Sequence, residues 1–171
     1  MPGYSAIPVV VDACLKGFEG IDLEKVYAAV KESATGDHEP GVKDLMKYGY
    51  IPSDYMAESI ASTMEYAIAD WGIAQLAAKL NKPKDYEYFL NRSKSYKNYF
   101  DPETKFMRGK MADGSWRTPF DPKSAQHRVN DYCEGNAWQY LWLTPQDPEG
   151  LIELLGGDKG FTTKLDQLFS I

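Results

Sequence analysis

Apolar residues recur at helical spacing along most of the chain, and glycine and proline interrupt the pattern at intervals. The strongest stretch runs from Ala57 to Leu80, where Ile60, Met64, Ile68 and Trp71 follow one another at spacings of three and four. Alanine is abundant in this stretch, which favours the helix and allows a neighbour to pack closely. The pattern therefore predicts one long, well-packed helix.

The same spacing predicts further helices along the chain. Asp22 is a good N-cap for one of them, because its carboxylate can accept from a free backbone N–H of the first turn. The loops between the helices are short, which favours antiparallel neighbours. We expect an all-α fold of about seven or eight helices stacked as hairpins. The remaining predicted ranges are Pro8–Lys16, Leu23–Ala34, Val42–Tyr48, Asp85–Phe100, Gly135–Leu143, Pro148–Leu155 and Lys159–Phe169.

The helical pattern is interrupted at residues 101–122, which contain two Asp-Pro pairs and one Asp-Gly pair. We expect a small hairpin in which Lys105–Gly109 and Ser115–Pro119 pair around Ala112–Gly114. A loop of this length in a helical protein is usually functional or disordered. Its aromatic residues argue against disorder.

Composition narrows the class of protein. The chain has 171 residues, 43% of them hydrophobic, and a net charge of −6. This suits one folded domain and excludes a disordered chain. No run of 18 apolar residues exists that could span a membrane. The acidic balance argues against binding to nucleic acid, which needs clustered basic residues.

Two further counts bear on chemistry. Cys14 and Cys133 lie far apart without any CxxC spacing, so a structural zinc site is not predicted. Aromatic residues make up 13% of the chain. Some of these aromatic side chains can pack in the hydrophobic core. Others can form a surface that stacks on flat apolar ligands, including the C–H faces of sugars.

Glu134 is the main candidate for chemistry, because it lies among tryptophans and tyrosines just before a predicted helix. Burial there raises the pKa of a carboxyl group, which a general acid needs near neutral pH. The dipole at the N-terminus of the helix has the opposite effect, because it favours the ionised carboxylate and so lowers the pKa. The structural alternative is that Glu134 caps the helix that follows. The residues alone leave both interpretations open.

Five other polar residues are weaker candidates. Glu65 and Asp70 share the long predicted helix, where they can line an inner face or lie on the surface. His127, near Asp131, and His38, in a polar loop, are more often structural or exposed than ligands. Asp12 interrupts an apolar run and needs a partner if it is buried.

Three runs of the sequence resemble the catalytic domain of glycoside hydrolase family 92. They are GYSAIPVVVDA at Gly3–Ala13, MEYAIADWGIA at Met64–Ala74 and YCEGNAWQY at Tyr132–Tyr140. An FMR stretch, Phe106–Arg108, lies between the second and third runs. The order of these motifs is more specific than any one of them.

The resemblance implies an exo-acting α-mannosidase, many of which are specific for α-1,2 linkages, that inverts the anomeric centre. It implies an (α/α)6 toroid preceded by a β-sandwich domain, and a calcium ion whose ligands cannot be assigned here. Glu134 matches the general acid. The substrate is a mannose-containing glycan, for which we expect contacts from Trp116, Asn136, Trp138 and Gln139.

The chain departs from the family pattern because it lacks the downstream base and the GNEP-like segment. We therefore expect residues 1–171 to form part of the toroid, without the β-sandwich domain and the C-terminal half, and to be inactive alone. Asp131 is too close along the chain to face Glu134 as a base. We also expect an exposed apolar surface that favours self-association, and a secreted or periplasmic parent protein. The alternative is a non-enzymatic helical domain that binds carbohydrate or a partner.

Overall fold

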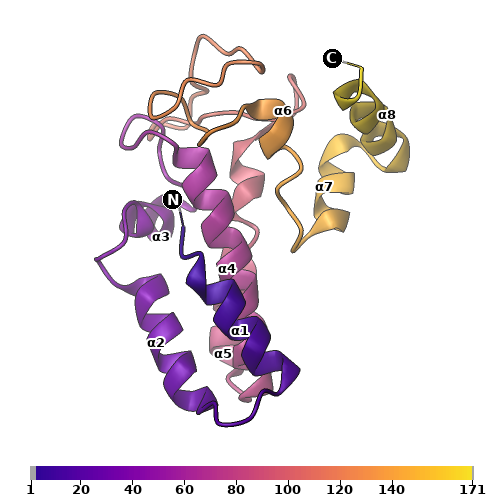
Figure 1. Ribbon diagram of the computed structural model, residues 1–171. Helices are drawn as coiled ribbons and strands as arrows, with labels where there is room; N and C mark the ends of the chain where they lie inside the picture. The colour runs from indigo at the N-terminus through magenta and orange to yellow at the C-terminus, as the bar shows by residue number, and fades with distance from the viewer. Residues whose placement is uncertain (1–2, 171) are drawn as a thin grey trace.

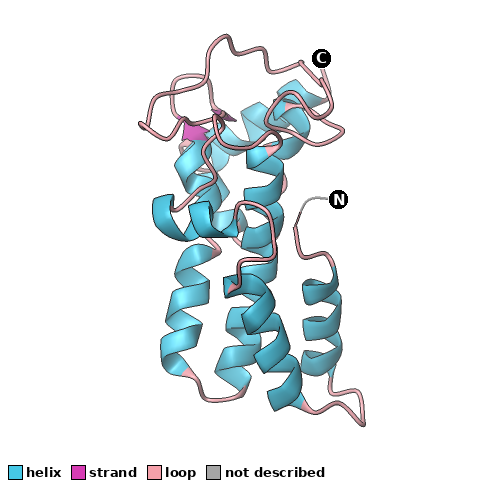
Figure 2. Ribbon diagram, turned by 90° about the vertical axis from the view of Figure 1, so that its left-hand side faces the viewer, coloured by secondary structure: helices cyan, strands magenta, loops and turns pink. Residues whose placement is uncertain are grey.

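The computed structural model describes residues 3–170, which form a mostly helical structure (Figures 1 and 2). The α-helices are α1 (Ala6–Lys16), α2 (Leu23–Thr35), α3 (Val42–Tyr48), α4 (Ser59–Lys79), α5 (Pro83–Arg92), α6 (Ala137–Tyr140), α7 (Pro148–Leu155) and α8 (Asp158–Leu168). A 3₁₀ helix, η1 (Ser95–Tyr99), follows α5. Strands β1 (Phe100–Asp101) and β2 (Phe106–Met107) pair antiparallel. The predicted all-α class is confirmed.

Helix α4 is the centre of the structure. It is buried on nearly every side, with α1, α2 and α5 packed against it (Figure 1). A helix that is apolar all round needs such a cover to exclude water. The loops and α6 lie at one end of this group of helices, and α7 and α8 form a pair beside that end (Figure 1).

Buried side chains form two clusters that α4 connects. The first, which we call the bundle core, lies among α1, α2, α4 and α5 and includes Val11, Tyr27, Ile73 and Phe89. The second, the aromatic core, receives Ile60 and other residues from the first turns of α4. Its other members come from η1, the strands, α6, α7 and the loops beside them, so this core supports the loop end of the molecule. They include Tyr96, Tyr99, Phe106, Tyr132 and Leu141.

A buried ion pair joins α4 to α5. Asp70 is fully buried, and Arg92 donates to both of its carboxylate oxygens, with Nε at 2.6 Å from Oδ2. Complete burial raises the pKa of Asp70 to about 6, although the Arg92 guanidinium acts in the opposite direction. Asp70 is therefore neither a surface charge nor a free group on an inner wall; it holds two helices together.

Several predicted elements are confirmed at their boundaries. The ranges Val42–Tyr48 and Pro148–Leu155 agree with α3 and α7, and Asp22 caps α2 by accepting from the backbone N–H of Lys25 at 3.1 Å. Gly49 ends α3 in the left-handed region with φ 78°. Glycine suits that conformation because it has no Cβ.

The prediction of one helix over Asp85–Phe100 is wrong. The α-helix ends at Arg92, and the chain continues as the tighter η1. Tertiary contacts explain the change, because the hydroxyls of Tyr96 and Tyr99 donate to Asp147 Oδ2 and to the Ile51 carbonyl. An uninterrupted α-helix would turn these two side chains differently.

The helix predicted over Gly135–Leu143 is also shorter in the structure. Only Ala137–Tyr140 is α-helical. The bonds from Trp142 N to Gln139 O and from Leu143 N to Tyr140 O span three residues. Such bonds tighten the last turn and end the helix before Pro145.

The predicted hairpin is confirmed around its turn and wrong at its base. Lys110 and Trp116 form an antiparallel bridge, and Arg117 N donates to Gly109 O at 2.7 Å. However, Phe106 pairs with Asp101 rather than with the 115–119 segment. Across residues 3–170, no helix combines the length and the apolar character that crossing a membrane requires.

Candidate functional site

Glu134 lies in the turn between Tyr132, a residue of the aromatic core, and the start of α6. Its φ of 51° falls in the left-handed region, which a residue with a side chain adopts at a cost on the order of 1–3 kcal/mol. Such a conformation persists only where its surroundings fix it. The flanking residues on both sides do so.

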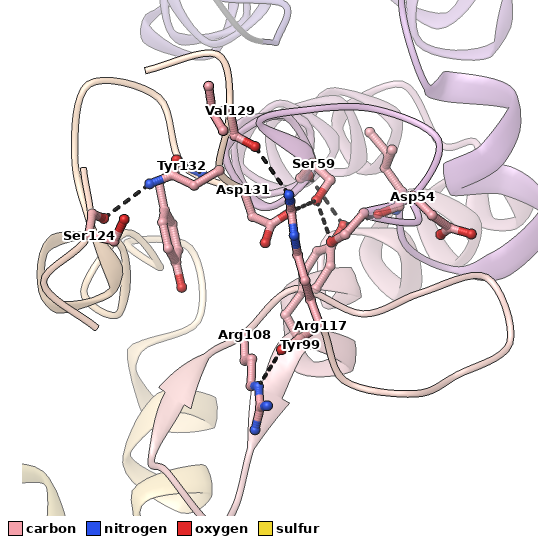
Figure 3. Close-up of polar contacts among 12 residues, drawn as sticks. Asp54, Ser59, Tyr99, Arg108, Arg117, Ser124, Val129, Asp131 and Tyr132 are labelled. Carbon is pink, nitrogen blue, oxygen red and sulfur yellow. Dashed lines mark hydrogen bonds and ion pairs between the residues drawn. The ribbon is translucent and has the colours of Figure 1, made fainter. Parts of the chain in front are cut away.

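Asp131 anchors the chain before Glu134. Its Oδ1 accepts from Arg117 Nη1 at 2.9 Å and from Ser59 Oγ at 3.1 Å (Figure 3). Its backbone carbonyl accepts from Ala61 N at 3.1 Å, which ties the segment to the start of α4. A Cβ at Gly109 would lie 2.2 Å from Asp131 Oδ2, so only glycine fits beside this carboxylate. The position of Asp131 is therefore fixed by four residues, two from α4 and two from the hairpin.

Two tyrosines continue the anchoring toward Glu134. The Tyr132 hydroxyl donates to the carbonyl of Met107. The Tyr140 hydroxyl donates to the Cys133 carbonyl at 2.8 Å and accepts from the Cys133 N–H at 3.3 Å. Burial raises the pKa of Tyr132 and raises that of Tyr140 to about 12, so both hydroxyls remain donors near neutral pH.

Asn136 fixes the chain after Glu134. Its side chain accepts from the N–H groups of Trp138 and Gln139, and Gln139 Oε1 accepts from the Asn136 N–H at 3.1 Å. This is a complete capping box, in which two residues satisfy each other's backbone groups. The cap of α6 is therefore Asn136, and the structural alternative that assigned this role to Glu134 is wrong.

The Glu134 side chain is exposed, and it has no ion pair or hydrogen bond with any residue of the described range 3–170. The expectation that tryptophans and tyrosines desolvate this carboxyl is thus wrong for this chain taken alone. The aromatic neighbours in sequence point into the aromatic core instead. Four cavities in the described range are lined by other residues.

The predicted substrate-binding aromatic residues are largely engaged in packing. Trp138 meets Phe106 edge-on with ring centroids 4.7 Å apart, and the ammonium of Lys164 lies 4.4 Å from its ring centroid. Trp116 is half-buried in the bridge with Lys110, whose ammonium lies 5.3 Å from its ring centroid. Asn136 and Gln139 use their amide oxygens within the capping box. The structure thus gathers Asn136, Trp138 and Gln139 around α6, one turn from Glu134.

A cavity of about 450 Å³ lies beside the anchor of this segment. Arg108, Arg117 and Phe120 line it together with Asp131 and Tyr132. Figure 3 shows Arg117 reaching across to Asp131 and to the Val129 carbonyl, while Arg108 donates to the Arg117 carbonyl. Both guanidinium groups are held in place and present charge and planar donors to the cavity.

The weaker candidate residues lie in different parts of the structure and do not form one site. Asp12 is exposed and pairs with Lys16 at 2.7 Å, and His38 is exposed in its loop. Glu65 is half-buried, which raises its pKa. His127 lies with Nδ1 3.2 Å from Oε1 of Glu58.

Sequence reasoning missed one grouping. Glu58, His127 and Cys133 bring their ligand atoms within 4.8 Å of one another. These three residues come from different segments, so no spacing motif reveals them. Burial raises the pKa of the Cys133 thiol, and the negative charges of Glu58 and Glu134 raise it further to a smaller extent.

Known proteins match the chain closely. Residues 1–171 match the glycosyl hydrolase family 92 catalytic domain. A curated relative, an uncharacterized secreted glycosidase from Arthroderma benhamiae, is 28% identical over 97% of this chain and 26% of its own length.

Solved structures agree. The family GH92 α-mannosidase BT3965 from Bacteroides thetaiotaomicron, in complex with mannoimidazole, has a TM-score of 0.96 at 43% identity, covering 100% of this chain and 23% of that one. The inverting mannosidase BT2199 of the same organism has a TM-score of 0.91 at 34% identity, covering 97% and 23%. The chain thus spans about a quarter of the length of these relatives. Since the match runs over all of its residues, the chain belongs to glycosyl hydrolase family 92, within the catalytic domain.

Proposed function

We propose that this chain supplies one wall of the active site of an α-mannosidase, with Glu134 as the general acid. One observation carries the proposal: hydrogen bonds on both sides of Glu134 hold it in a left-handed turn, while its carboxyl has no partner among residues 3–170. Strained backbone that is fixed by its surroundings is a recurrent feature of functional sites. Family membership and the mannosidase relatives supply the reaction class.

The chemistry that we propose is hydrolysis of a terminal α-mannoside with inversion. The Glu134 carboxyl gives its proton to the glycosidic oxygen as the bond to the anomeric carbon breaks. A water molecule attacks the opposite face of the sugar, and a base takes its proton. Inverting enzymes separate the two carboxyl groups by about 6.5–9.5 Å to make room for this water.

Asp131 is unsuited to be this base. It is buried, its Oδ1 already accepts from Arg117 and Ser59, and it lies three residues from Glu134 on the same wall. We therefore propose that the base belongs to a part of the whole protein outside these residues. On this account residues 1–171 form a partial (α/α)6 toroid and are inactive alone.

The calcium ion that the family resemblance implies does not fit a set of donors within residues 3–170. Calcium takes six to eight oxygen ligands. The amide oxygens of Asn136 and Gln139 are used in the capping box, and the ligand group formed by Glu58, His127 and Cys133 offers a thiol and an imidazole. We keep calcium dependence of the whole enzyme as a proposal and assign it no step here.

The finer features of the function are also proposals. We infer exo action on terminal α-1,2-linked mannose of a glycan, and secretion or a periplasmic location, which the name of the fungal relative supports. Val9 and Val10 of α1 and Trp71 of α4 are exposed. Such apolar side chains suit contact with further helices of the toroid, and self-association when this chain is alone.

The test uses the intact protein and α-1,2-mannobiose. We expect release of mannose first as the β-anomer by ¹H NMR, loss of activity on chelation, and no activity for residues 1–171 alone. Glu134→Gln lowers the rate by a factor on the order of 10²–10⁴, the usual contribution of a general acid. Glu19→Gln, an equal charge change at an exposed position between α1 and α2, serves as the control. Wild-type rates in Glu134→Gln would contradict the role of Glu134.

A further inference from the structure

Three side chains beside Glu134 converge although the mannosidase proposal gives them no role. Glu58 precedes α4, His127 lies in the loop after the hairpin, and Cys133 precedes Glu134. Their ligand atoms all lie within 4.8 Å of one another, and Glu58 Oε1 is 3.2 Å from His127 Nδ1. This is a carboxylate, an imidazole and a thiol at one point of the surface.

The backbone holds this arrangement in place. The N–H of Glu58 donates to the Asn130 carbonyl at 2.9 Å, and the N–H of Arg128 donates to Glu58 Oε1 at 3.1 Å. Glu58 and Arg128 both adopt the left-handed region, with φ of 58° and 60°. Two segments far apart in sequence are thus joined directly after His127, at residues 128 and 130, which reduces the ordering needed to bind a ligand.

An ion pair between His127 and Glu58 alone does not explain why the Cys133 thiol lies beside them. Nothing in that pair requires the Cys133 sulfur to lie within reach of both groups. Cys133 is also fixed independently, because Tyr140 bonds to both its N–H and its carbonyl. His127 is exposed, so solvent reaches the group, whereas Glu58 and Cys133 are half-buried.

The donor types select the class of ion. Thiolate and imidazole suit Zn²⁺, whereas calcium and magnesium prefer oxygen donors alone. Zinc binds sulfur at about 2.3 Å and nitrogen or oxygen at about 2.0–2.2 Å, which places tetrahedral ligands about 3.3–3.8 Å apart. The pair of Glu58 and His127 is already close to this spacing, and the third ligand atom lies within 4.8 Å, so zinc binding requires the Cys133 sulfur to move nearer.

We propose that Glu58, His127 and Cys133 form a zinc site with three protein ligands and a fourth position open to water. The proposal does not depend on the role of Glu134. It joins the start of α4 to the loop that carries Glu134. Bound zinc therefore fixes the backbone of Cys133, the residue before the proposed acid.

The experiment titrates the chain with Co²⁺, which reports thiolate coordination through a charge-transfer band in the near ultraviolet, and then displaces the cobalt with Zn²⁺. We expect one equivalent to bind. Cys133→Ser abolishes the band, and His127→Gln and Glu58→Gln each weaken binding at least about tenfold, the smallest effect typical of altered metal sites. His38→Gln, which changes the other histidine, leaves binding unchanged.

The controls make each outcome decisive. Circular dichroism confirms that the variants fold, and His127→Gln removes an exposed side chain, so it leaves the cores intact. Cys14 remains in Cys133→Ser and tests whether the band arises from the other thiol. The proposal is overturned if no stoichiometric binding occurs, if the band survives in Cys133→Ser, or if millimolar Ca²⁺ displaces the cobalt as readily as Zn²⁺ does.

Discussion

The Tyr140 hydroxyl binds both backbone groups of Cys133, donating to its carbonyl at 2.8 Å and accepting from its N–H at 3.3 Å. The side chain thereby reaches back from α6 across the turn that contains Glu134. Since the ring also packs on Tyr132, with centroids 5.4 Å apart, the hydroxyl has little freedom to leave this position. Tyr140 acts as a clamp on the turn.

The first prediction concerns this clamp. Tyr140→Phe keeps the ring and removes the hydroxyl, so we expect stability to fall by only about 1 kcal/mol, the usual contribution of one hydrogen bond. In the intact protein, kcat falls at least about tenfold because the carboxyl of Glu134 is no longer held in one place. Steady-state kinetics and urea unfolding measure the two effects.

The control is Tyr66→Phe, which removes a similar bond on α4, from the Tyr66 hydroxyl to the Pro40 carbonyl at 2.8 Å. It should lose similar stability without the loss in kcat. Equal kinetics in both variants would show that the clamp does not position Glu134.

The second prediction concerns backbone strain at Glu134. Glu134→Gly removes the cost of a side chain at φ 51°, so we expect the free energy of unfolding to rise, by an amount on the order of 1 kcal/mol, while activity is lost. Glu19→Gly, at an exposed position without this conformation, should lower stability or leave it unchanged. Thermal and urea unfolding compare the two variants. A clear loss of stability in Glu134→Gly would mean that its side chain makes a stabilising contact.

The third prediction concerns the ion pair of Asp70 and Arg92. Asp70→Ala leaves a buried guanidinium without its partner and is expected to cost about 3–5 kcal/mol, because an unpaired buried charge is poorly solvated. The double variant Asp70→Leu/Arg92→Met removes both charges and should recover most of this loss. Urea unfolding of the single and double variants distinguishes the two cases. Additive losses would argue against a coupled pair.

The fourth prediction concerns pH. Burial lowers the pKa of Lys164 to about 8, although its ammonium lies 3.5 Å from the ring centroid of Phe106. Above that value the folded chain loses this proton while the unfolded chain keeps it, so the free energy of unfolding should rise with pH. Above about pH 10 the tyrosines ionise in the unfolded chain but stay protonated where they are buried, which reverses the trend. We expect a gain on the order of 1 kcal/mol between about pH 7.5 and 9.5.

Lys164→Met provides the comparison for this effect. The variant keeps an apolar side chain of similar length on α8 but has no proton to lose, so its stability should be flat over the same interval. Chemical unfolding at several pH values measures the difference between the two proteins. An equal pH dependence in both would show that the ring of Phe106 fully compensates the burial of the ammonium.

The helices could be predicted because local signals agreed with the packing. Asp22, Gly49 and Pro148 mark boundaries by their own chemistry, as N-cap, left-handed C-cap and first helical residue. The helix over Asp85–Phe100 failed because its apolar spacing continues while the hydroxyls of Tyr96 and Tyr99 take distant partners. Such bonds depend on the fold and leave no trace in local periodicity.

The candidate site was predictable in part. The YCEGNAWQY run pointed to Glu134, and the three-residue separation from Asp131 predicts that both residues lie on one wall of the site, which stays a prediction. The expected desolvation of Glu134 failed because Trp138 packs on Phe106 rather than over the carboxyl. The group of Glu58, His127 and Cys133 could not be predicted, since only folding brings these segments together.

The most direct test of the account compares leaving groups in Glu134→Gln of the intact protein. A general acid matters most when the departing oxygen is a poor leaving group, so kcat/KM should fall by a factor on the order of 10³ with α-1,2-mannobiose and far less with a dinitrophenyl α-mannoside. This result would identify Glu134 as the proton donor. An equal loss with both substrates would contradict that role.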